Sequence, residues 1–286
     1  MNDSSFLITG ANGQLGTALQ AQYPHARAVD ANELDITNPE ALAAYDWSGI
    51  TTILNAAAYT NVDGAETAEG RQLAWKVNAS AMSYLADIAR MHSITLVHIS
   101  SDYVFDGTQT PHLETEPFAP LSVYGASKAA GDIAVSGTSK HYILRTSWVI
   151  GEGKNFVRTM LGLGEKNISP TVVDDQIGRL TFTSELVRAI DHLLSSDAPH
   201  GTYNVTNSGD SASWADITRT IFQEAGYSDL AVTGTSTKDY FAGKEGIAPR
   251  PLQSTLGLDK LTSTGFVSVD WREDLSRYIS REQSTK

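Results

Sequence analysis

Short apolar runs alternate with helix-like patterns through the first half of the chain. The apolar runs predict strands at Phe6–Thr9, Ala28–Val29, Thr52–Leu54, Thr95–Ile99 and Tyr142–Leu144. The intervening patterns predict helices at Gln14–Gln22, Pro39–Tyr45, Arg71–Met91 and Val123–Val135. Regular alternation of strands and helices is typical of an α/β fold with a parallel sheet. We therefore predict a doubly wound, Rossmann-type sheet.

The longest of these helices carries a regular apolar stripe. Its apolar positions recur every three or four residues, at Leu73, Val77, Ala81, Leu85 and Ile88. That spacing predicts one continuous buried face.

The pattern loosens after Trp148, where glycines and a Gly/Ser/Thr-rich tract interrupt it. We predict a first domain over residues 1–150 and a smaller lobe built mainly from residues 151–286. A segment near 180–206, which contains a further helical pattern at Ser184–Leu194, is expected to return to the first domain.

Three glycines follow the first predicted strand directly, with the spacing GxxGxxG. Gly10 permits a tight turn, Gly13 lets the backbone approach a pyrophosphate, and Gly16 lets the helix pack close to the strand. The helix start also presents N–H donors to an anion. A purely structural turn is the alternative, but the position at the first strand-to-helix junction favours a dinucleotide site.

Carboxylates follow the second predicted strand. Asp30 lies 20 residues after Gly10, and Asp35 comes soon after it. A carboxylate at this point can accept a hydrogen bond from the adenosine ribose, which favours NAD, and no arginine follows Asp30 to bind a 2′-phosphate. A helix cap or a solvated acid is the alternative for each. The next strand ends in small residues, including Ala58, against which a ribose or nicotinamide can lie.

A serine, a tyrosine and a lysine form the candidate catalytic group. Ser101 ends the fourth predicted strand, and Tyr124 and Lys128 lie four residues apart on a predicted helix, so they share a face. A nearby ammonium favours the phenolate form of tyrosine, and a serine hydroxyl can bind a reacting carbonyl oxygen. Ser100 competes with Ser101 for the serine role, and Ser127 is predicted to be a surface residue.

Composition excludes several classes of function. The chain has 286 residues, a formal charge of −12 and no cysteine. An acidic protein is a poor candidate for nonspecific binding to nucleic acid or to anionic membranes. The absence of cysteine excludes disulfides, thiolate metal sites and thiol nucleophiles. With no apolar run long enough to span a bilayer and no basic leader, we expect a cytoplasmic protein.

Several motifs together resemble the extended short-chain dehydrogenase/reductase family, and within it the dTDP-4-dehydrorhamnose reductases. The likeness runs from about Phe6 to about Tyr278. Its most specific pieces are SSDYVFDG at 100–107, PLSVYG at 120–125, RTSW at 145–148, DQIG at 175–178, and Arg250-Pro251 with Ser254 and Leu256. The resemblance implies reduction of the C4 keto group of dTDP-4-dehydro-L-rhamnose with NADH or NADPH.

The resemblance also assigns roles to residues. Tyr124 becomes the proton donor, Lys128 its partner and Ser101 the tuning hydroxyl. The implied cofactor residues are Gly10, Gly13, Gln14, Leu15, Gly16, Asp30, Asp35, Ile36, Ala58, Tyr59 and Thr60, together with Tyr124 and Lys128. The implied substrate residues are Ser101, Asp102, Tyr103, Trp148 and Arg250. Asn78 matches a helix asparagine that the wider family uses in a proton relay.

Two positions depart from the family pattern. Leu180 replaces a proline in the loop after the DQIG motif, where the family pattern reads Asp-Gln-x-Gly-x-Pro-Thr. Ala18 replaces a glutamate with which some relatives bind magnesium at a dimer interface. We therefore predict no metal site, and we treat a homodimer, and association with a 3,5-epimerase of the pathway, as open possibilities.

Three rival functions share this fold. Sugar-nucleotide 4,6-dehydratases use an Asp-Glu pair after the strand-end hydroxyl, but here Tyr103 follows Asp102. A 4-epimerase is harder to exclude, although its pattern at this strand end usually differs. A non-catalytic subunit, such as the regulatory subunit of methionine adenosyltransferase, also resembles this fold. Retention of Asp102 and Trp148 on the sugar side favours an enzyme.

Overall fold

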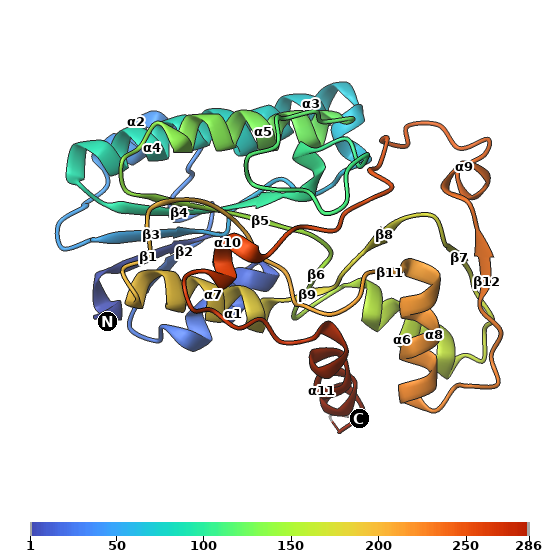
Figure 1. Cartoon of the computed structure of the whole chain (residues 1–286). Helices are drawn as coiled ribbons and strands as arrows, with labels where there is room; N and C mark the ends of the chain where they lie inside the picture. The colour runs from blue at the N-terminus through green and yellow to red at the C-terminus, as the bar shows by residue number, and fades with distance from the viewer. Residues whose placement is uncertain (1, 285–286) are drawn as a thin grey trace.

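A computed structural model describes residues 2–284. Within them, a parallel six-stranded sheet has the order β10-β5-β4-β3-β1-β2 (Figure 1). Its strands are β1 (Phe6–Thr9), β2 (Arg27–Val29), β3 (Thr52–Asn55), β4 (Thr95–Ser101), β5 (His141–Thr146) and β10 (Gly201–Asn204). The strand order changes direction between β1 and β3, and nucleotides bind at the carboxyl ends of strands beside such a switch. The predicted fold class is confirmed.

Helices cover both faces of this sheet (Figure 1). One face packs against α1 (Gln14–Gln22) and α7 (Thr183–Ser195), and the other against α2 (Pro39–Ala44), α4 (Ala81–His92) and α5 (Val123–Ser136). Neighbouring residues of β1 point to opposite faces: Ile8 joins the core under α1 and α7, whereas Leu7 joins the core under α4. Burial on both faces explains why the strands have continuous rather than alternating apolar runs.

The long helix predicted at 71–91 is interrupted. It divides into α3 (Ala68–Trp75), a π-helical turn at Lys76–Ser80, and α4. The predicted continuous buried face is wrong at its start, since Leu73 is 50% exposed while Ala74 and Asn78 are buried. A π-turn takes more residues than an α-turn, so it rotates the upstream side chains relative to the stripe.

The smaller lobe has a core of its own, to which Leu180 and Trp271 contribute fully buried side chains. Its helices are α6 (Phe156–Glu165), α8 (Trp214–Ala225), α9 (Thr237–Tyr240) and α11 (Trp271–Ser284). Its paired short strands are β6 (Val149–Ile150) with β9 (Thr181–Phe182), β7 (Thr171–Val173) with β12 (Thr233–Thr235), and β8 (Ile177–Gly178) with β11 (Ala212–Ser213). Leu180, where the family has proline, therefore serves the packing of this lobe.

The chain passes repeatedly between the sheet and the smaller lobe. Helix α7 and strand β10, at 183–204, return to the large sheet, and α10 (Asp259–Thr262) contacts β10 before α11 returns to the smaller lobe. A boundary at residue 150 stays a prediction, because no single cut of the chain separates the packed cores.

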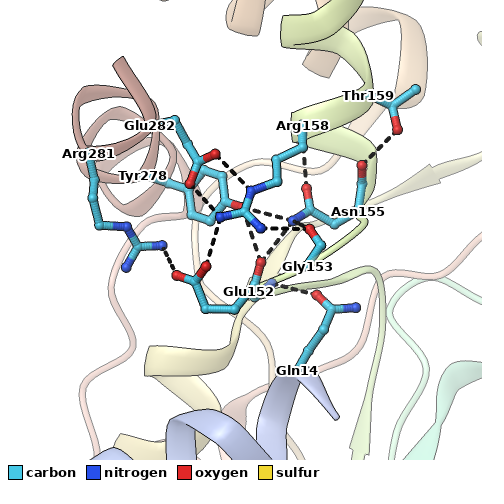
Figure 2. Close-up of polar contacts among 10 residues, drawn as sticks. Gln14, Glu152, Gly153, Asn155, Arg158, Thr159, Tyr278, Arg281 and Glu282 are labelled. Carbon is cyan, nitrogen blue, oxygen red and sulfur yellow. Dashed lines mark hydrogen bonds and ion pairs between the residues drawn. The ribbon is translucent and has the colours of Figure 1, made fainter. Parts of the chain in front are cut away.

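A polar cluster links α11 to the start of α1 (Figure 2). The Gln14 side chain accepts a hydrogen bond from the Gly151 N–H at 2.8 Å, and the Tyr278 hydroxyl donates to the Gly151 carbonyl at 3.1 Å. Asn155 donates to both Gly151 and Tyr278 at 2.8 Å. At the surface of this cluster, the Arg158 guanidinium binds Glu282 through two hydrogen bonds of 2.7 and 2.8 Å. The glycine loop is thus tied to the last helix of the described chain.

Candidate active site

A cleft of about 390 Å³ opens at the carboxyl ends of the central strands. The predicted site residues that line it are Gly13, Gln14, Leu15, Ala58, Thr60, Ser101, Asp102, Tyr103, Tyr124, Lys128 and Trp148. The predicted residues outside its lining are Gly10, Gly16, Asp30, Asp35, Ile36, Tyr59 and Arg250. The structure thus brings the proposed catalytic group and the glycine loop to one cavity.

The glycine loop needs its first and third glycines for steric reasons. Gly10 has a φ of +71°, and a Cβ there would lie 2.5 Å from the Ala57 nitrogen. A Cβ on Gly16 would lie 2.1 Å from the Gly10 carbonyl oxygen. Gly13 is exposed at the N-cap of α1, where the first helical N–H groups lack partners in the helix. This cradle fits a pyrophosphate.

The two candidate ribose carboxylates have different surroundings. Asp30 directly follows β2 and accepts a hydrogen bond from the Asn12 side chain of the glycine loop at 2.7 Å. Asp35 accepts from the Thr37 hydroxyl at 2.6 Å and from the Thr37 N–H at 2.9 Å, and these bonds lower the pKa of Asp35. The other oxygen of Asp30 accepts from the Asn32 N–H at 2.8 Å. Both aspartates therefore stabilise a turn, and Asp30 in addition contacts the glycine loop. Ile36 is buried in the core.

Asn78, in the π-turn, holds the loop that follows β3. Its side chain accepts from the Tyr59 N–H at 2.9 Å and donates to the Tyr59 carbonyl at 3.0 Å. It also lies 3.0 Å from the hydroxyl of Ser127, which donates to the Tyr124 carbonyl at 2.7 Å. The expectation that Ser127 lies on the surface is wrong, because Ser127 is fully buried between these elements. Sequence spacing alone could not reveal the packing of two helices across it.

The serine and tyrosine of the catalytic group lie together. The Ser101 hydroxyl donates to Asp102 at 3.1 Å and accepts from the Tyr103 N–H at 3.2 Å. Burial raises the pKa of Tyr124 to about 12, an effect that the nearby Ser101 hydroxyl partly offsets. Tyr103 packs edge to face against Tyr124 with ring centroids 5.5 Å apart. Tyr124 is therefore held in its neutral, proton-carrying form.

Lys128 lies beneath this pair and is 2% exposed. Its ammonium donates to the Ile99 carbonyl at 2.6 Å, and burial lowers the pKa of Lys128 to about 8. One turn further along α5, Asp132 forms a buried ion pair with Arg145 at 3.0 Å, and His98 lies 3.8 Å from Asp132. Sequence reasoning missed this cluster, although the period of four from Tyr124 through Lys128 to Asp132 was a usable signal.

Asp102 is a buried carboxylate in the lining of the cleft, with 2% exposure. Burial raises the pKa of Asp102 to about 6, while the hydroxyls of Ser254 and Ser101 act in the opposite direction. A carboxyl group in such a position can accept a hydrogen bond from a sugar hydroxyl, or donate one when it is protonated.

Arg250 lies outside the cleft lining. Its guanidinium donates to both carboxylate oxygens of Asp63 at 2.8 Å, and the Asp63 carboxylate also accepts from the Ala248 N–H. These contacts fasten the segment before Arg250 to the loop that follows β3. Both charges lie near Tyr103, so the pair stands close to the cleft, and direct binding of substrate by Arg250 stays a prediction.

Trp148 lines the cleft where the chain leaves the large sheet. Its φ is +49°, in the left-handed region that side-chain-bearing residues rarely adopt. Such a conformation costs about 1–3 kcal/mol and persists only where the surroundings enforce it. The Thr181 N–H donates to the Trp148 carbonyl at 3.1 Å and helps to fix that backbone.

A second cavity lies away from the candidate catalytic group. Across residues 2–284, no group of three or more His, Asp or Glu side chains is placed to hold a metal ion. In the same range, no helix is both long and apolar enough to cross a membrane. Ala18 lines a larger cavity of about 740 Å³ between α1, α7 and α11, which contains none of the catalytic group.

Comparison with known proteins identifies the family. The family model described as "RmlD substrate binding domain" matches residues 4–284. The chain belongs to this family. A dTDP-4-dehydrorhamnose reductase of Aggregatibacter actinomycetemcomitans is 37% identical, over 94% of this chain and 96% of its own length. A probable dTDP-4,6-dihydroxy-2-methyloxan-3-one 4-ketoreductase of Streptomyces antibioticus is 38% identical, over 94% and 92%.

A solved structure shares the whole architecture. The dTDP-4-dehydrorhamnose reductase of Bacillus anthracis, in complex with NADP, superimposes with a TM-score of 0.87. It is 36% identical and covers 96% of this chain and 98% of its own. The family match therefore extends over both the sheet and the smaller lobe.

Proposed function

We propose that this protein is an NAD(P)H-dependent dTDP-4-dehydrorhamnose reductase, which reduces the C4 keto group of dTDP-4-dehydro-L-rhamnose to give dTDP-L-rhamnose. The observation that carries the proposal is the convergence of Ser101, Tyr124 and Lys128 with the glycine loop in one cleft of a member of this family. The names of the relatives support the substrate class, a dTDP-linked keto sugar.

The residues around the glycine loop are suited to hold the cofactor. Gly13, Gln14 and Leu15 line the cleft at the start of α1 and would receive the diphosphate. Asp30, beside Asn12, is the better placed carboxylate for the adenosine ribose. When bound there, the reduced nicotinamide supplies a hydride to the keto carbon.

Tyr124 supplies the proton that completes the reduction. As negative charge develops on the keto oxygen, the neutral phenol of Tyr124 donates its proton to that oxygen. The Ser101 hydroxyl, turned away from Asp102, donates a second hydrogen bond to it. The raised pKa of Tyr124 keeps the proton on the phenol until the keto oxygen becomes more basic. Charge thus develops where two donors already lie.

Lys128 stabilises the phenolate that Tyr124 becomes when it gives up its proton. Its ammonium lies on the same helix face as Tyr124, and its presence favours the transient phenolate electrostatically. Because burial lowers the pKa of Lys128 to about 8, we expect the reaction to slow as the pH rises above that value.

The identity of the sugar is the least constrained part of the proposal. The relative from Streptomyces antibioticus, named for a different keto sugar, is as similar in sequence as the rhamnose enzyme. Reduction of another dTDP-linked 4-keto sugar is therefore the second candidate function. Both candidates use the same proton donor and the same cofactor loop.

Purified protein should oxidise NADPH or NADH when mixed with dTDP-4-dehydro-L-rhamnose, and loss of reduced-cofactor absorbance would measure the rate. The sugar product, isolated and identified, should be dTDP-L-rhamnose. Preferential reduction of another dTDP-4-keto sugar would select the second candidate. No oxidation with any of these sugars would refute reductase activity and favour a binding subunit.

We further propose cytoplasmic residence, since reduced nicotinamide cofactors and nucleotide sugars are supplied there. A homodimer, and association with the 3,5-epimerase that would produce the substrate, are also proposed. Cell fractionation, light scattering of the purified protein and co-purification with the epimerase test these three statements separately. A monomer at all concentrations would contradict the dimer without affecting the chemistry.

A further inference from the structure

Two tryptophans from distant parts of the chain stack beside the cleft. The rings of Trp148 and Trp214 lie with centroids 3.7 Å apart and planes 19° from parallel. Trp148 lines the cleft, whereas Trp214, the first residue of α8, does not. Trp214 therefore reaches the cleft only through the ring of Trp148.

The position of Trp214 is fixed from three sides. Phe156 packs against it with ring centroids 4.4 Å apart. The Trp214 indole N–H lies 3.3 Å from the side-chain oxygen of Gln176, and the Gln176 amide donates to Thr237 at 3.0 Å. Ser213 caps the helix directly before Trp214 in a capping box. A ring held by packing, a hydrogen bond and a capped helix end has little freedom to rotate.

Trp148 depends on this support. Its backbone has the strained positive φ already described, so its own main chain does not favour the observed orientation. Trp214 covers one face of the Trp148 ring. The edge of the six-membered ring of Trp148 lies against Gly178, since a Cβ added to Gly178 would come within 3.0 Å of it. The ring is only half-buried, so part of it stays available to the cleft.

We propose that Trp214 is a positioning residue that holds the Trp148 ring as a platform on which the sugar of the substrate packs. This inference rests on the proposed function, because it assumes a nucleotide-linked sugar in the cleft. The apolar C–H face of a pyranose packs on a flat indole, and a platform fixed in advance loses less conformational entropy on binding. Trp214 then acts on sugar affinity without touching the sugar.

Three variants separate this role from general damage to the lobe. Trp214→Leu removes the supporting ring but keeps an apolar side chain, and Trp214→Phe keeps a ring. Trp75→Phe is the matched control, because Trp75 is 43% exposed on α3. We expect Trp214→Leu to raise KM for the keto sugar nucleotide about tenfold with kcat changed no more than about twofold, and Trp214→Phe to restore most of the affinity.

Binding without turnover provides the second measurement. We expect Trp214→Leu to weaken dTDP-L-rhamnose about tenfold in calorimetry, while the affinity for dTDP alone stays within about twofold of wild type. Equal weakening of both ligands would show loosening of the lobe and overturn the inference, as would an unchanged affinity for the sugar nucleotide. A wild-type protein that binds dTDP-L-rhamnose no better than dTDP would overturn it too. These results do not require turnover, so a failure of the proposed reaction is recognised separately.

Near-ultraviolet circular dichroism gives a direct signature of the stack. Two indoles this close and nearly parallel should couple their transitions. We expect the resulting couplet in wild type and in Trp75→Phe, and its loss in Trp214→Leu. A wild-type spectrum without the couplet, or a couplet that survives Trp214→Leu, would contradict the stacked pair.

Discussion

At the catalytic end of the cleft Asp102 and Lys128 are each 2% exposed, whereas at the glycine-loop end Gly13 is exposed and Asp30 half-exposed. In the buried end, removal of water shifts the pKa of Asp102 to about 6 and that of Lys128 to about 8. At the open end, the Asp30 carboxylate accepts hydrogen bonds from the Asn12 side chain and from the Asn32 N–H. One cleft can therefore combine a buried end, where pKa values are shifted for chemistry, with an open end that discriminates weakly between cofactors.

The largest effect should come from the buried end. Tyr124→Phe removes the proton donor, and we expect kcat to fall by about 10²–10⁴, which corresponds to roughly 3–5 kcal/mol of barrier. NADH binding should stay close to wild type, because the phenyl ring keeps the packing against Tyr103. Steady-state kinetics and cofactor titration measure the two quantities. Retention of more than about a tenth of the rate would exclude Tyr124 as the donor.

A second difference should appear in stability. The pKa of Asp102 is raised from 3.8 to about 6, so folding favours its protonated form and the ionised form destabilises the protein at higher pH. That shift corresponds to roughly 3 kcal/mol. We expect Asp102→Asn to unfold with a free energy higher by about this amount at pH 8, and with no such gain below pH 4.

Denaturant unfolding at pH 4, 6 and 8 tests the stability prediction, with Asp30→Asn as the matched substitution at the open end. We expect Asp30→Asn to change stability by less than about 0.5 kcal/mol. If the gain in Asp102→Asn were absent at pH 8, or equal at all three pH values, burial would not be the dominant influence on this carboxyl group.

The preference between NADH and NADPH should be weak, since it depends on residues at the open end of the cleft. Asp30 and Asp35 both oppose a 2′-phosphate, but Asp35 is engaged by Thr37 and Asp30 is only half-buried. We expect both NADH and NADPH to support reduction, with kcat/KM values that differ by less than about a thousandfold, or 4 kcal/mol. Measuring kcat/KM with each cofactor tests this expectation, and a larger preference for either one would show that the open end discriminates strongly between them.

The smallest expected effect is that of metal removal. The charge on the keto oxygen is met by Tyr124 and Ser101, so the reaction needs no Lewis acid. We expect full steady-state activity after exhaustive treatment with EDTA, and no gain when magnesium is added back. Activity that collapses with chelator and returns with magnesium, at unchanged oligomeric state, would refute the metal-free mechanism.

Local patterns were sufficient to predict much of the fold. Strand β1 and helix α1 begin and end at the predicted residues. Their bounds depend only on an apolar run and a glycine turn that are adjacent in the sequence. The π-turn at 76–80 was not predictable, since it serves the contacts of Asn78 with Tyr59 and Ser127. Those contacts join segments that are 19 and 49 residues apart.

The candidate site divides in the same way. Tyr124 and Lys128 were predicted as site residues because one helix presents both, and Ser101 because it ends a strand. The support by Trp214 could not be predicted, because Trp148 and Trp214 are 66 positions apart in the sequence and no local pattern indicates that their rings stack. Sequence patterns reveal residues that act from one element, whereas residues that act through another element require the assembled structure.

The repeated passage of the chain between its two parts restricts how such a protein can be altered. The elements α7, β10 and α10 return to the large sheet between segments of the smaller lobe. That lobe is therefore not formed by one continuous segment of the chain. It cannot be grafted from a relative by a single crossover without dividing a packed core. New sugar preferences should therefore arise, in evolution or in the laboratory, through point changes and loop exchanges such as those around Gln176, rather than through shuffling of whole domains.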